Sequence, residues 1–379
     1  MSDATRLSDR PSIEHYRKRA KARVKAGAAP TLAKAQFQIA REHGFASWPK
    51  FAKHVEGMAR ARSPISRFEK AVDAIVAGDA TTVARLVRED PTLVRARSTR
   101  DHHSTLLHYV SANGVEDFRQ KTPKDIVAIT RLLLDAGADV NAESTAYGGH
   151  STALNLAATS LHPAVAGVQR ELMQLLLDRG ATFDGRDVVA CLRNGRGPAA
   201  EHLAERGARL DLEGAAGVGR LDVVKGFFDA EGRLRPPATQ EQMADAFAAA
   251  CGYGKTSVVE FLLQRGMNVA AKLKNHGQTG LHDAATGGFV DIVELLLKWG
   301  APVDARDGSF DATPLGWALY GWSEGETPDP RADYHTVVER LIDSGVPMNP
   351  AWLTRDDEFG RKVRADARIH AALTKGLRP

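Results

Sequence analysis

Cysteine is scarce in this sequence of 379 residues. Only Cys191 and Cys251 occur, and sixty residues separate them. That spacing excludes a disulfide framework and a cysteine-rich zinc motif. So few thiols are typical of a chain kept in a reducing compartment. We therefore expect a cytoplasmic protein in which both cysteines are small core residues.

Long apolar runs and a leader segment are also absent. No apolar stretch reaches the roughly 18 residues that a membrane-spanning helix needs. The N-terminal stretch MSDATRLSDRPSIEHYRKRA lacks the apolar centre of a secretory signal. We expect neither membrane insertion nor secretion.

The usual motifs of catalysis are missing. The sequence has no G-x-S-x-G, no H-E-x-x-H, no paired C-x-x-C and no complete phosphate-binding loop. GYGKTS (252–257) is similar to the end of such a loop, but the pattern before it does not predict a strand. We expect no enzymatic activity, no cofactor and no bound metal ion.

Charge is distributed unevenly along the chain. The net charge is +4, yet residues 1–64 hold fourteen Lys/Arg and five Asp/Glu, so the remainder carries −5. This asymmetry indicates a basic segment attached to a mildly acidic body.

The strongest pattern present is an internal repeat. One phrase recurs, in which apolar residues at helical spacing usually end near a glycine that can terminate the helix. Its copies are TTVARLVRED (81–90), AITRLLLDAG (128–137), ELMQLLLDRG (171–180), AAEHLAERG (199–207), DVVKGFFDAEG (222–232), SVVEFLLQRG (257–266), DIVELLLKWG (291–300) and TVVERLIDSG (336–345). A shorter helix of small residues precedes the better copies, as in STLLHYVSANG (104–114) and TGLHDAATGG (279–288).

These residues resemble the ankyrin repeat family. GQTGLHDAATGGFVDIVELLLKWGAPVDARD (277–307) is similar to the family pattern along its whole length, and Gly300 follows Gly266 by 34 residues, near the period of about 33. The resemblance implies an all-α fold, an α-solenoid of about eight ankyrin-like helix-turn-helix repeats with helical caps at both ends. We expect a basic helical cap at 1–64, the repeat array at 66–350 and a C-terminal capping helix at 351–379.

Three insertions fall between the two helices of a repeat, near 115–125, 160–169 and 323–334. Two interpretations stay open for them: tolerated surface loops, or an accessory binding edge. The repeats at 185–235 are shortened instead, so we expect an irregular segment there.

Three histidines crowd DHHSTLLHYV (101–110). In the family pattern Thr-Pro-Leu-His, the histidine bonds within the repeat, and the resemblance places His108 and His282 in that slot. Asn155 and Gly316 occupy the same slot in other repeats, which argues against a catalytic or metal site. His102 and His103 precede the repeat on a loop tip, where we expect exposed imidazoles.

Partners of ankyrin proteins usually dock on the loop tips and short helices of the concave face, so the resemblance implies a protein partner there. The short helices contribute Ala112, Asn113, Thr159, Thr286 and Tyr320. The tip candidates are Arg97, Arg100, His102, His103, Tyr147, His150, Lys272, Lys274, Asn275, His276, Arg306, Asp307 and Phe310. Tyr147, Phe310, Tyr320 and Trp322 stand out because aromatic side chains dominate interface hot spots, although Trp322 also fits a packed position.

The basic N-terminal segment predicts three helices, at 13–27, 31–44 and 47–60, with Thr31 and Ser47 as caps and Pro49 in a first turn. AQFQIAREHGFASWPKFAKHVE (35–56) resembles the helical lead-in of many bacterial ankyrin proteins. A capping role is the simpler interpretation. The alternative is contact with nucleic acid or another anionic surface through Arg17, Lys18, Arg19, Lys21, Arg23 and Lys25.

The function we expect is that of a monomeric, non-enzymatic protein–protein interaction scaffold. The alternative is a regulator whose basic N-terminal helix contacts nucleic acid or another anionic surface.

Overall fold

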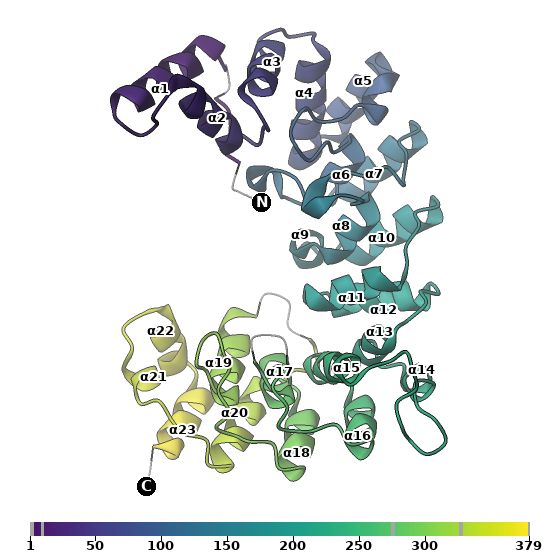
Figure 1. Ribbon diagram of the computed structural model, residues 1–379, viewed down its shortest axis with the longest axis vertical. Helices are drawn as coiled ribbons and strands as arrows, with labels where there is room; N and C mark the ends of the chain where they lie inside the picture. Colours follow the sequence, from purple (N-terminus) through teal and green to yellow (C-terminus); the bar gives the residue numbers. More distant parts are fainter. Residues whose placement is uncertain (1–3, 9–10, 274–276, 326–328, 378–379) are drawn as a thin grey trace. The chain divides into compact units, whose positions relative to one another are not determined.

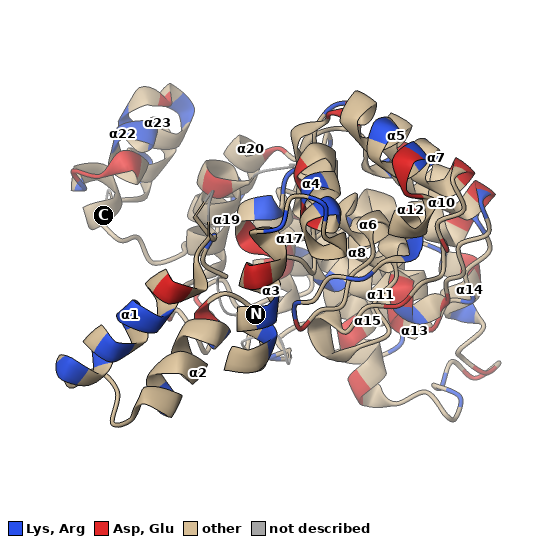
Figure 2. Ribbon diagram, turned by 90° about the horizontal axis from the view of Figure 1, so that it is seen from above, with Lys and Arg blue, Asp and Glu red and all other residues tan. Residues whose placement is uncertain are grey.

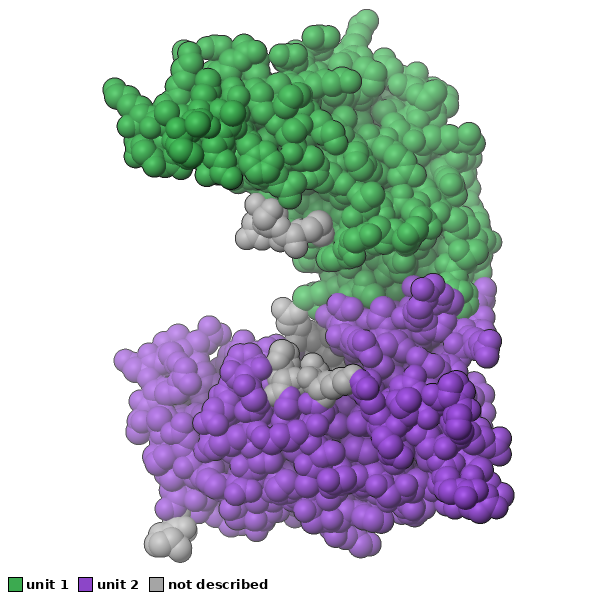
Figure 3. All heavy atoms as spheres, viewed as in Figure 1, with its two compact units in different colours: residues 1–183 green, residues 184–379 purple. Residues whose placement is uncertain are grey.

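The computed structural model describes residues 4–8, 11–273, 277–325 and 329–377. The chain forms two compact units, residues 1–183 and residues 184–379 (Figure 3). Every regular element in the described ranges is helical, and extended pairing there is limited to two isolated bridges, Ser144 with Ser151 and Phe228 with Leu234. The all-α prediction is confirmed, whereas the predicted division into cap, array and cap stays a prediction.

Three helices with a core of their own open the first unit: α1 (Ile13–Lys25), α2 (Leu32–Glu42) and α3 (Trp48–Met58) (Figure 1). Tyr16, Ile39 and Phe51 meet between them, each at most 2% exposed. The backbone N–H of Lys34 donates to the Thr31 hydroxyl at 3.2 Å, as the cap prediction requires. Ser47 precedes α3 without a side-chain capping bond.

Helices of the first unit then follow in pairs, with short extra elements at the joints and tips. The pairs are α4 (Pro64–Ala77) with α5 (Ala80–Glu89), α6 (Leu106–Tyr109) with α7 (Ile126–Asp135), and α8 (Ala153–Thr159) with α10 (Gln169–Asp178). The extra elements are η1 (Pro91–Arg95), η2 (Asp117–Arg119), η3 (Ala146–Gly148) and α9 (Leu161–Val165). The insertions near 115–125 and 160–169 thus each contain a helical turn.

The second unit repeats the same pairing. Its pairs are α11 (Gly185–Arg193) with α12 (Gly197–Glu205), α13 (Leu212–Gly217) with α14 (Leu221–Lys225), α15 (Gln240–Gly252) with α16 (Thr256–Gln264), α17 (Gly280–Gly287) with α18 (Val290–Lys298), and α19 (Pro314–Glu324) with α20 (Tyr334–Asp343). From the pair α13 and α14 onward, the first helix of each pair packs against the first helix of the next pair. The second helices pack against one another in the same way, and these two layers are those of an α-solenoid. After the second helices of two pairs, Gly266 and Gly300 adopt φ values of 86° and 80°, which end those helices without the strain that a side chain would add.

Two segments differ from the prediction. DVVKGFFDAEG is not one helix, because α14 ends at Lys225 and the chain turns back so that Phe228 pairs with Leu234. The backbone N–H of Arg233 donates to the Asp229 carboxylate at 2.8 Å and stabilises this turn. The single capping helix expected at 351–379 is instead the short α21 (Ala351–Thr354) followed by two longer helices, α22 (Glu358–Ala365) and α23 (Ala367–Gly376). Asp366 separates them because its carboxylate accepts the first N–H groups of α23.

The apolar side chains of the second unit form one continuous cluster from Leu212 to Leu373, so α22 and α23 close the end of the array. None of the helices formed by the described residues combines the length and the hydropathy that a bilayer crossing requires.

Candidate functional site

His108 joins one repeat to the next. Its Nδ1 accepts the backbone N–H of Thr105 at 3.1 Å, and its Nε2 donates to the carbonyl of Ser151 at 3.0 Å. His282 repeats this arrangement with Thr279 at 3.0 Å and the carbonyl of Ala312 at 3.2 Å. Burial lowers the pKa of His108 to about 4, and the pKa of His282 falls for the same reason. Both rings are therefore neutral near pH 7 and act as rigid hydrogen-bonded links.

Asn155 makes a related contact with its own repeat. The backbone N–H of Thr152 donates to Asn155 Oδ1 at 3.0 Å, and the backbone N–H of Asn155 donates to the Thr152 hydroxyl at 3.3 Å. An amide oxygen thus replaces the imidazole nitrogen as acceptor. At Gly316 only the second bond is present, from its N–H to the Thr313 hydroxyl at 3.4 Å.

The other two histidines of DHHSTLLHYV lie in different surroundings from His108, and the exposure predicted for them is only partly correct. His103 is half-buried, and His102 is 8% exposed. The Nδ1 of His102 accepts the N–H of Ser104 at 3.2 Å, and its Nε2 lies 3.7 Å from a carboxylate oxygen of Glu116. Among the residues that the structure describes, no three His, Cys, Asp or Glu side chains are grouped to hold a metal ion.

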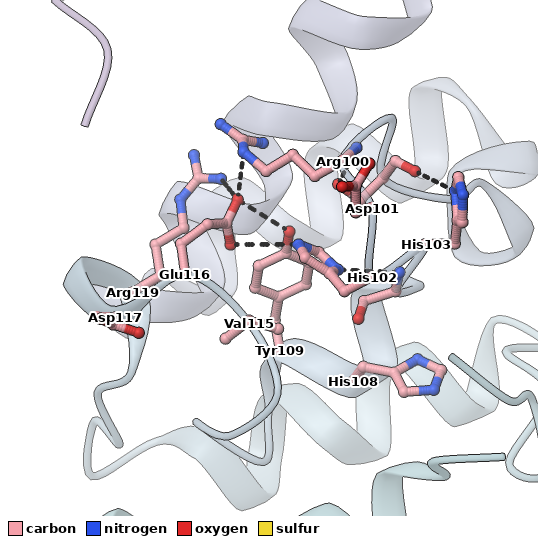
Figure 4. Close-up of polar contacts among 12 residues, drawn as sticks. Arg100, Asp101, His102, His103, His108, Tyr109, Val115, Glu116, Asp117 and Arg119 are labelled. Carbon is pink, nitrogen blue, oxygen red and sulfur yellow. Dashed lines mark hydrogen bonds and ion pairs between the residues drawn. The ribbon is translucent and has the colours of Figure 1, made fainter. Parts of the chain in front are cut away.

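A buried cluster of four charges lies beside His102, and Figure 4 shows three of them, Arg100, Glu116 and Arg119. It consists of Glu69, Arg100, Glu116 and Arg119, whose side chains are at most 7% exposed. Arg100 Nη1 contacts Glu69 Oε1 at 2.7 Å and its Nε contacts Glu116 Oε1 at 2.7 Å. Arg119 Nη1 contacts the same two carboxylates at 2.7 and 3.2 Å. Each acid thus meets both arginines, so the four charges balance.

Electrostatics keeps both acids of this cluster ionised. Burial alone would raise the pKa of Glu69 and of Glu116, but Arg100 and Arg119 outweigh it and hold both pKa values below their usual range. The phenol of Tyr109, which has no exposed surface, donates to Glu116 Oε1 at 3.5 Å. The prediction that Arg100 and His102 face solvent is therefore wrong. The spacing of residues in the sequence does not indicate that Arg100 and His102 are buried, because Glu69 and Glu116 come from other elements.

The remaining candidates on loop tips and short helices differ in exposure. Asp307 and Ala112 are also buried, at 5% and 0%, which corrects the expectation that they face solvent. Lys274, Asn275 and His276 lie outside the described residues. Asn113, Thr159 and Thr286 are half-buried, and the exposed candidates are Arg97, Tyr147, His150, Lys272, Arg306, Phe310 and Tyr320.

Asp307 is buried because it organises the tip before α19. Its carboxylate accepts the backbone N–H groups of Ser309 and Phe310 at 2.7 and 2.6 Å, and the indole N–H of Trp317 at 2.9 Å. Burial alone would raise the pKa of Asp307, but these donors outweigh it and lower that pKa to about 2. The tip is therefore fixed around a permanent negative charge.

The same tip carries three aromatic rings that contact one another. Trp317 lies between Phe310 and Tyr320, with ring centroids 5.7 and 5.4 Å away and near-perpendicular planes. Phe310 is 68% exposed and Tyr320 is 55% exposed. We call Phe310, Trp317 and Tyr320 the aromatic tip. Sequence reasoning missed Trp317, although its position three residues before Tyr320 on one helix face signals the contact. Trp322 packs against Phe359 of α22 instead.

Lys and Arg residues occur along the whole of α1 (Figure 2). They divide into a set that lies near carboxylates and a set that does not. Arg23 makes a two-pronged contact with Glu42 at 2.6 and 2.8 Å, and Arg19 and Arg17 lie 4.0 and 3.5 Å from carboxylates. Lys18, Lys21 and Lys25 are exposed and form no ion pair with the residues that the structure describes.

Comparison with known proteins identifies the repeat. Residues 212–307 match the family described as Ankyrin repeats (3 copies). The chain is 30% identical over 213 residues to Ankyrin repeat and KH domain-containing protein mask-1 of Caenorhabditis elegans, which covers 52% of this chain and 7% of that protein. It is 30% identical over 121 residues to Ankyrin repeat and SOCS box protein 6 of Mus musculus, covering 32% of this chain and 27% of that protein.

A shorter match, 46% identical over 54 residues, is to SMC5-SMC6 complex localization factor protein 1 of Homo sapiens, and it covers 14% of this chain and 5% of that protein. This chain thus spans only a small part of these curated relatives. All three relatives are animal proteins, so the bacterial type stays a prediction. The match at 212–307 and the paired helices on both sides of it agree, and together they support ankyrin repeats in this chain.

Proposed function

We propose that this chain is a non-enzymatic scaffold that binds a protein partner through its loop tips and short helices, with the aromatic tip as the principal contact. Ankyrin repeats act in protein–protein interaction. The observation that carries the proposal is that the buried carboxylate of Asp307 bonds Phe310 and Trp317. The ring of Trp317 in turn packs against those of Phe310 and Tyr320.

A fixed, exposed aromatic surface suits binding for two physical reasons. Large rings bury much apolar area, and their few rotatable bonds make ordering them inexpensive. The Asp307 contacts position Phe310 and Trp317 before any partner arrives, so little conformational entropy is lost on association. We expect the partner to be a cytoplasmic protein and the chain to act as a monomer.

The test is capture of partners by the full chain, followed by mass spectrometry and affinity measurement on the captured protein. Phe310→Ala together with Tyr320→Ala should weaken binding by about tenfold or more, as loss of hot-spot residues does. The matched control is Phe37→Ala, which removes another aromatic ring, 43% exposed, on α2.

Thermal unfolding completes this test. The melting temperature of the double variant should stay close to that of the unchanged chain, because both side chains are mostly exposed. A large drop in melting temperature, or equal capture by all three proteins, would reject the aromatic tip as the contact.

A second candidate function rests on Lys18, Lys21 and Lys25. Three exposed lysines without ion pairs on one helix can contact a polyanion, and such binding weakens as salt rises. The full chain should then bind double-stranded DNA at low salt, and replacing these lysines with Gln should abolish binding. Replacing Lys121, Lys124 and Lys298, also exposed, is the matched control. Absence of DNA binding at low salt rejects this candidate.

A further inference from the structure

The helices α11, α13 and α15 are three successive first helices of the second unit (Figure 1). A hollow with a mixed lining lies across them. Its volume is about 440 Å³. Val189 and Ala190 of α11 and Leu212 of α13 provide apolar lining. We call this hollow the α13 groove. None of its residues belongs to the aromatic tip.

Carboxylates outnumber free cations around the α13 groove. Arg193 lies among Asp211, Glu213 and Asp245, all of which act on its charge and raise its pKa, Glu213 most strongly through direct hydrogen bonds. Its guanidinium is already engaged with Glu213, through Nε at 2.9 Å and Nη2 at 2.6 Å. One cation among three carboxylates leaves two negative charges in excess.

The second arginine of the groove does not cancel this excess. Arg186 is held by Asp184, with Nε and Nη2 at 2.9 and 2.7 Å from its Oδ2. That pair is neutral by itself and most of the Arg186 side chain, 92%, is exposed to solvent.

The acceptors left over are those of Asp245 and Asp211. Among the described residues, Asp245 has no hydrogen-bond donor and no ion-pair partner, and its side chain is half-buried on α15. Asp211 accepts the N–H of Gly214 with Oδ1 at 2.7 Å, which leaves its Oδ2 free. A half-buried carboxylate without a partner favours an incoming cation over an incoming anion.

We propose that the α13 groove binds an arginine or lysine side chain of the protein partner, with the aliphatic stem on Val189, Ala190 and Leu212 and the charged head at Asp245 and Asp211. The shape suits these two residue types, because each carries a long apolar stem that ends in a cation. The inference rests on the proposed role in protein binding but uses a different surface.

The probe is N-acetyl-arginine N-methylamide, titrated into the full chain and followed by amide chemical shifts in ¹H–¹⁵N spectra. N-acetyl-citrulline N-methylamide has the same shape without the charge, and N-acetyl-glutamate N-methylamide has the opposite charge. The arginine compound should shift amides of α11, α13 and α15 and bind most tightly of the three, and rising salt should weaken it.

Two variants with opposite expected effects sharpen the test. Asp245→Asn should weaken binding of the arginine compound about threefold, which is the effect of one partly exposed charge. Arg193→Gln removes the competing cation and should strengthen binding by a similar factor. Asp356→Asn, an exposed carboxylate outside the groove, should change nothing. Circular dichroism and melting temperature check each fold, and Asp245→Asn decides alone if Arg193→Gln does not fold.

The proposal is overturned if the citrulline compound binds as well as the arginine compound, if Asp245→Asn has no effect, or if Arg193→Gln weakens binding and the glutamate compound binds more tightly. These outcomes are independent of the aromatic tip. Partner capture that depends on Phe310 and Tyr320 can survive failure of the α13 groove, and arginine binding in the groove can survive failure of the aromatic tip.

Discussion

Arg119 Nη1 lies 2.7 Å from Glu69 Oε2, although the two residues are fifty positions apart and come from different repeats. Arg119 belongs to the insertion near 115–125, and Glu69 belongs to α4. Both side chains are buried, at 7% and 2% exposure. The start of this insertion is therefore anchored against the preceding repeat, and this anchoring favours a structural role over a free binding edge.

Breaking this contact should destabilise the fold. Glu69→Gln removes one charge and leaves two buried arginines with one buried acid, Glu116, besides the exposed Asp73. Loss of one partner of a buried pair costs about 3–5 kcal/mol. Urea unfolding followed by circular dichroism measures the loss. As a control, Arg340→Met disrupts the half-exposed pair with Glu294 and should cost under about 1 kcal/mol. Equal losses in the two variants would contradict the importance of burial.

His108 offers a test of the link between repeats. His108→Ala leaves the buried N–H of Thr105 without a partner and should cost about 1–3 kcal/mol. The carbonyl of Ser151 loses one of two donors and keeps the N–H of Ser144 at 2.8 Å. His108→Asn should recover part of that loss, because Asn155 accepts the equivalent N–H in the next repeat. Thermal unfolding of the three proteins compares them. If Asn proves no better than Ala, the slot depends on packing rather than on the acceptor.

Acid should weaken the fold through its buried histidines. Burial lowers the pKa of His54 and of His108 to about 4, against about 6.5 in an unfolded chain. Their contribution is complete above pH 6.5 and is lost as pH falls toward 4, because only the unfolded state takes up protons in that window. We expect these two histidines together to lower the free energy of unfolding by up to about 2 kcal/mol per pH unit below pH 6.

Denaturant titrations between pH 7 and pH 4.5 measure this slope. His108→Asn removes one of the buried histidines with a lowered pKa and should make the slope shallower, by at most about 1.4 kcal/mol per pH unit. The carboxylates of Glu69 and Glu116 do not interfere, because their lowered pKa values move their effect below this window. An unchanged slope in the variant would exclude His108 as a contributor.

Asp283 should change the stability in the opposite direction from the histidines, because it should weaken the fold as pH rises. Its Oδ2 is buried and receives no hydrogen bond from any described residue, and burial raises the pKa of this carboxyl to about 8. Because the folded pKa exceeds the unfolded value of about 3.9, the native state binds the extra proton, so stability is complete below pH 4 and is lost as pH rises toward 8. Asp283→Asn should therefore stabilise the chain at pH 8 by about 1–3 kcal/mol and leave it unchanged at pH 4. Urea midpoints at both pH values check this, and an equal shift at both would show that charge is not the cause.

Much of the fold was predictable because its signals are local. The three N-terminal helices begin and end within a few residues of their predicted limits, since Thr31 and the apolar spacing act within a few turns. The break at Asp366 and the turn at Phe228 were missed. There, a side chain that caps backbone N–H groups competes with helix continuation, and the apolar pattern does not record that competition.

The features of the candidate site also divide into those that the sequence predicts and those that depend on the tertiary structure. By itself, the sequence determined the repeat, its closing glycines and the shared slot of His108 and His282, because these depend on residues within one period. The tertiary structure alone decided which tip residues face solvent. Arg100 and His102 are buried because Glu69 and Glu116 approach from other elements, and Asp307 is buried because it collects donors from its own loop and from α19. Burial of a charge depends on partners brought by folding, and periodicity along the chain does not specify those partners.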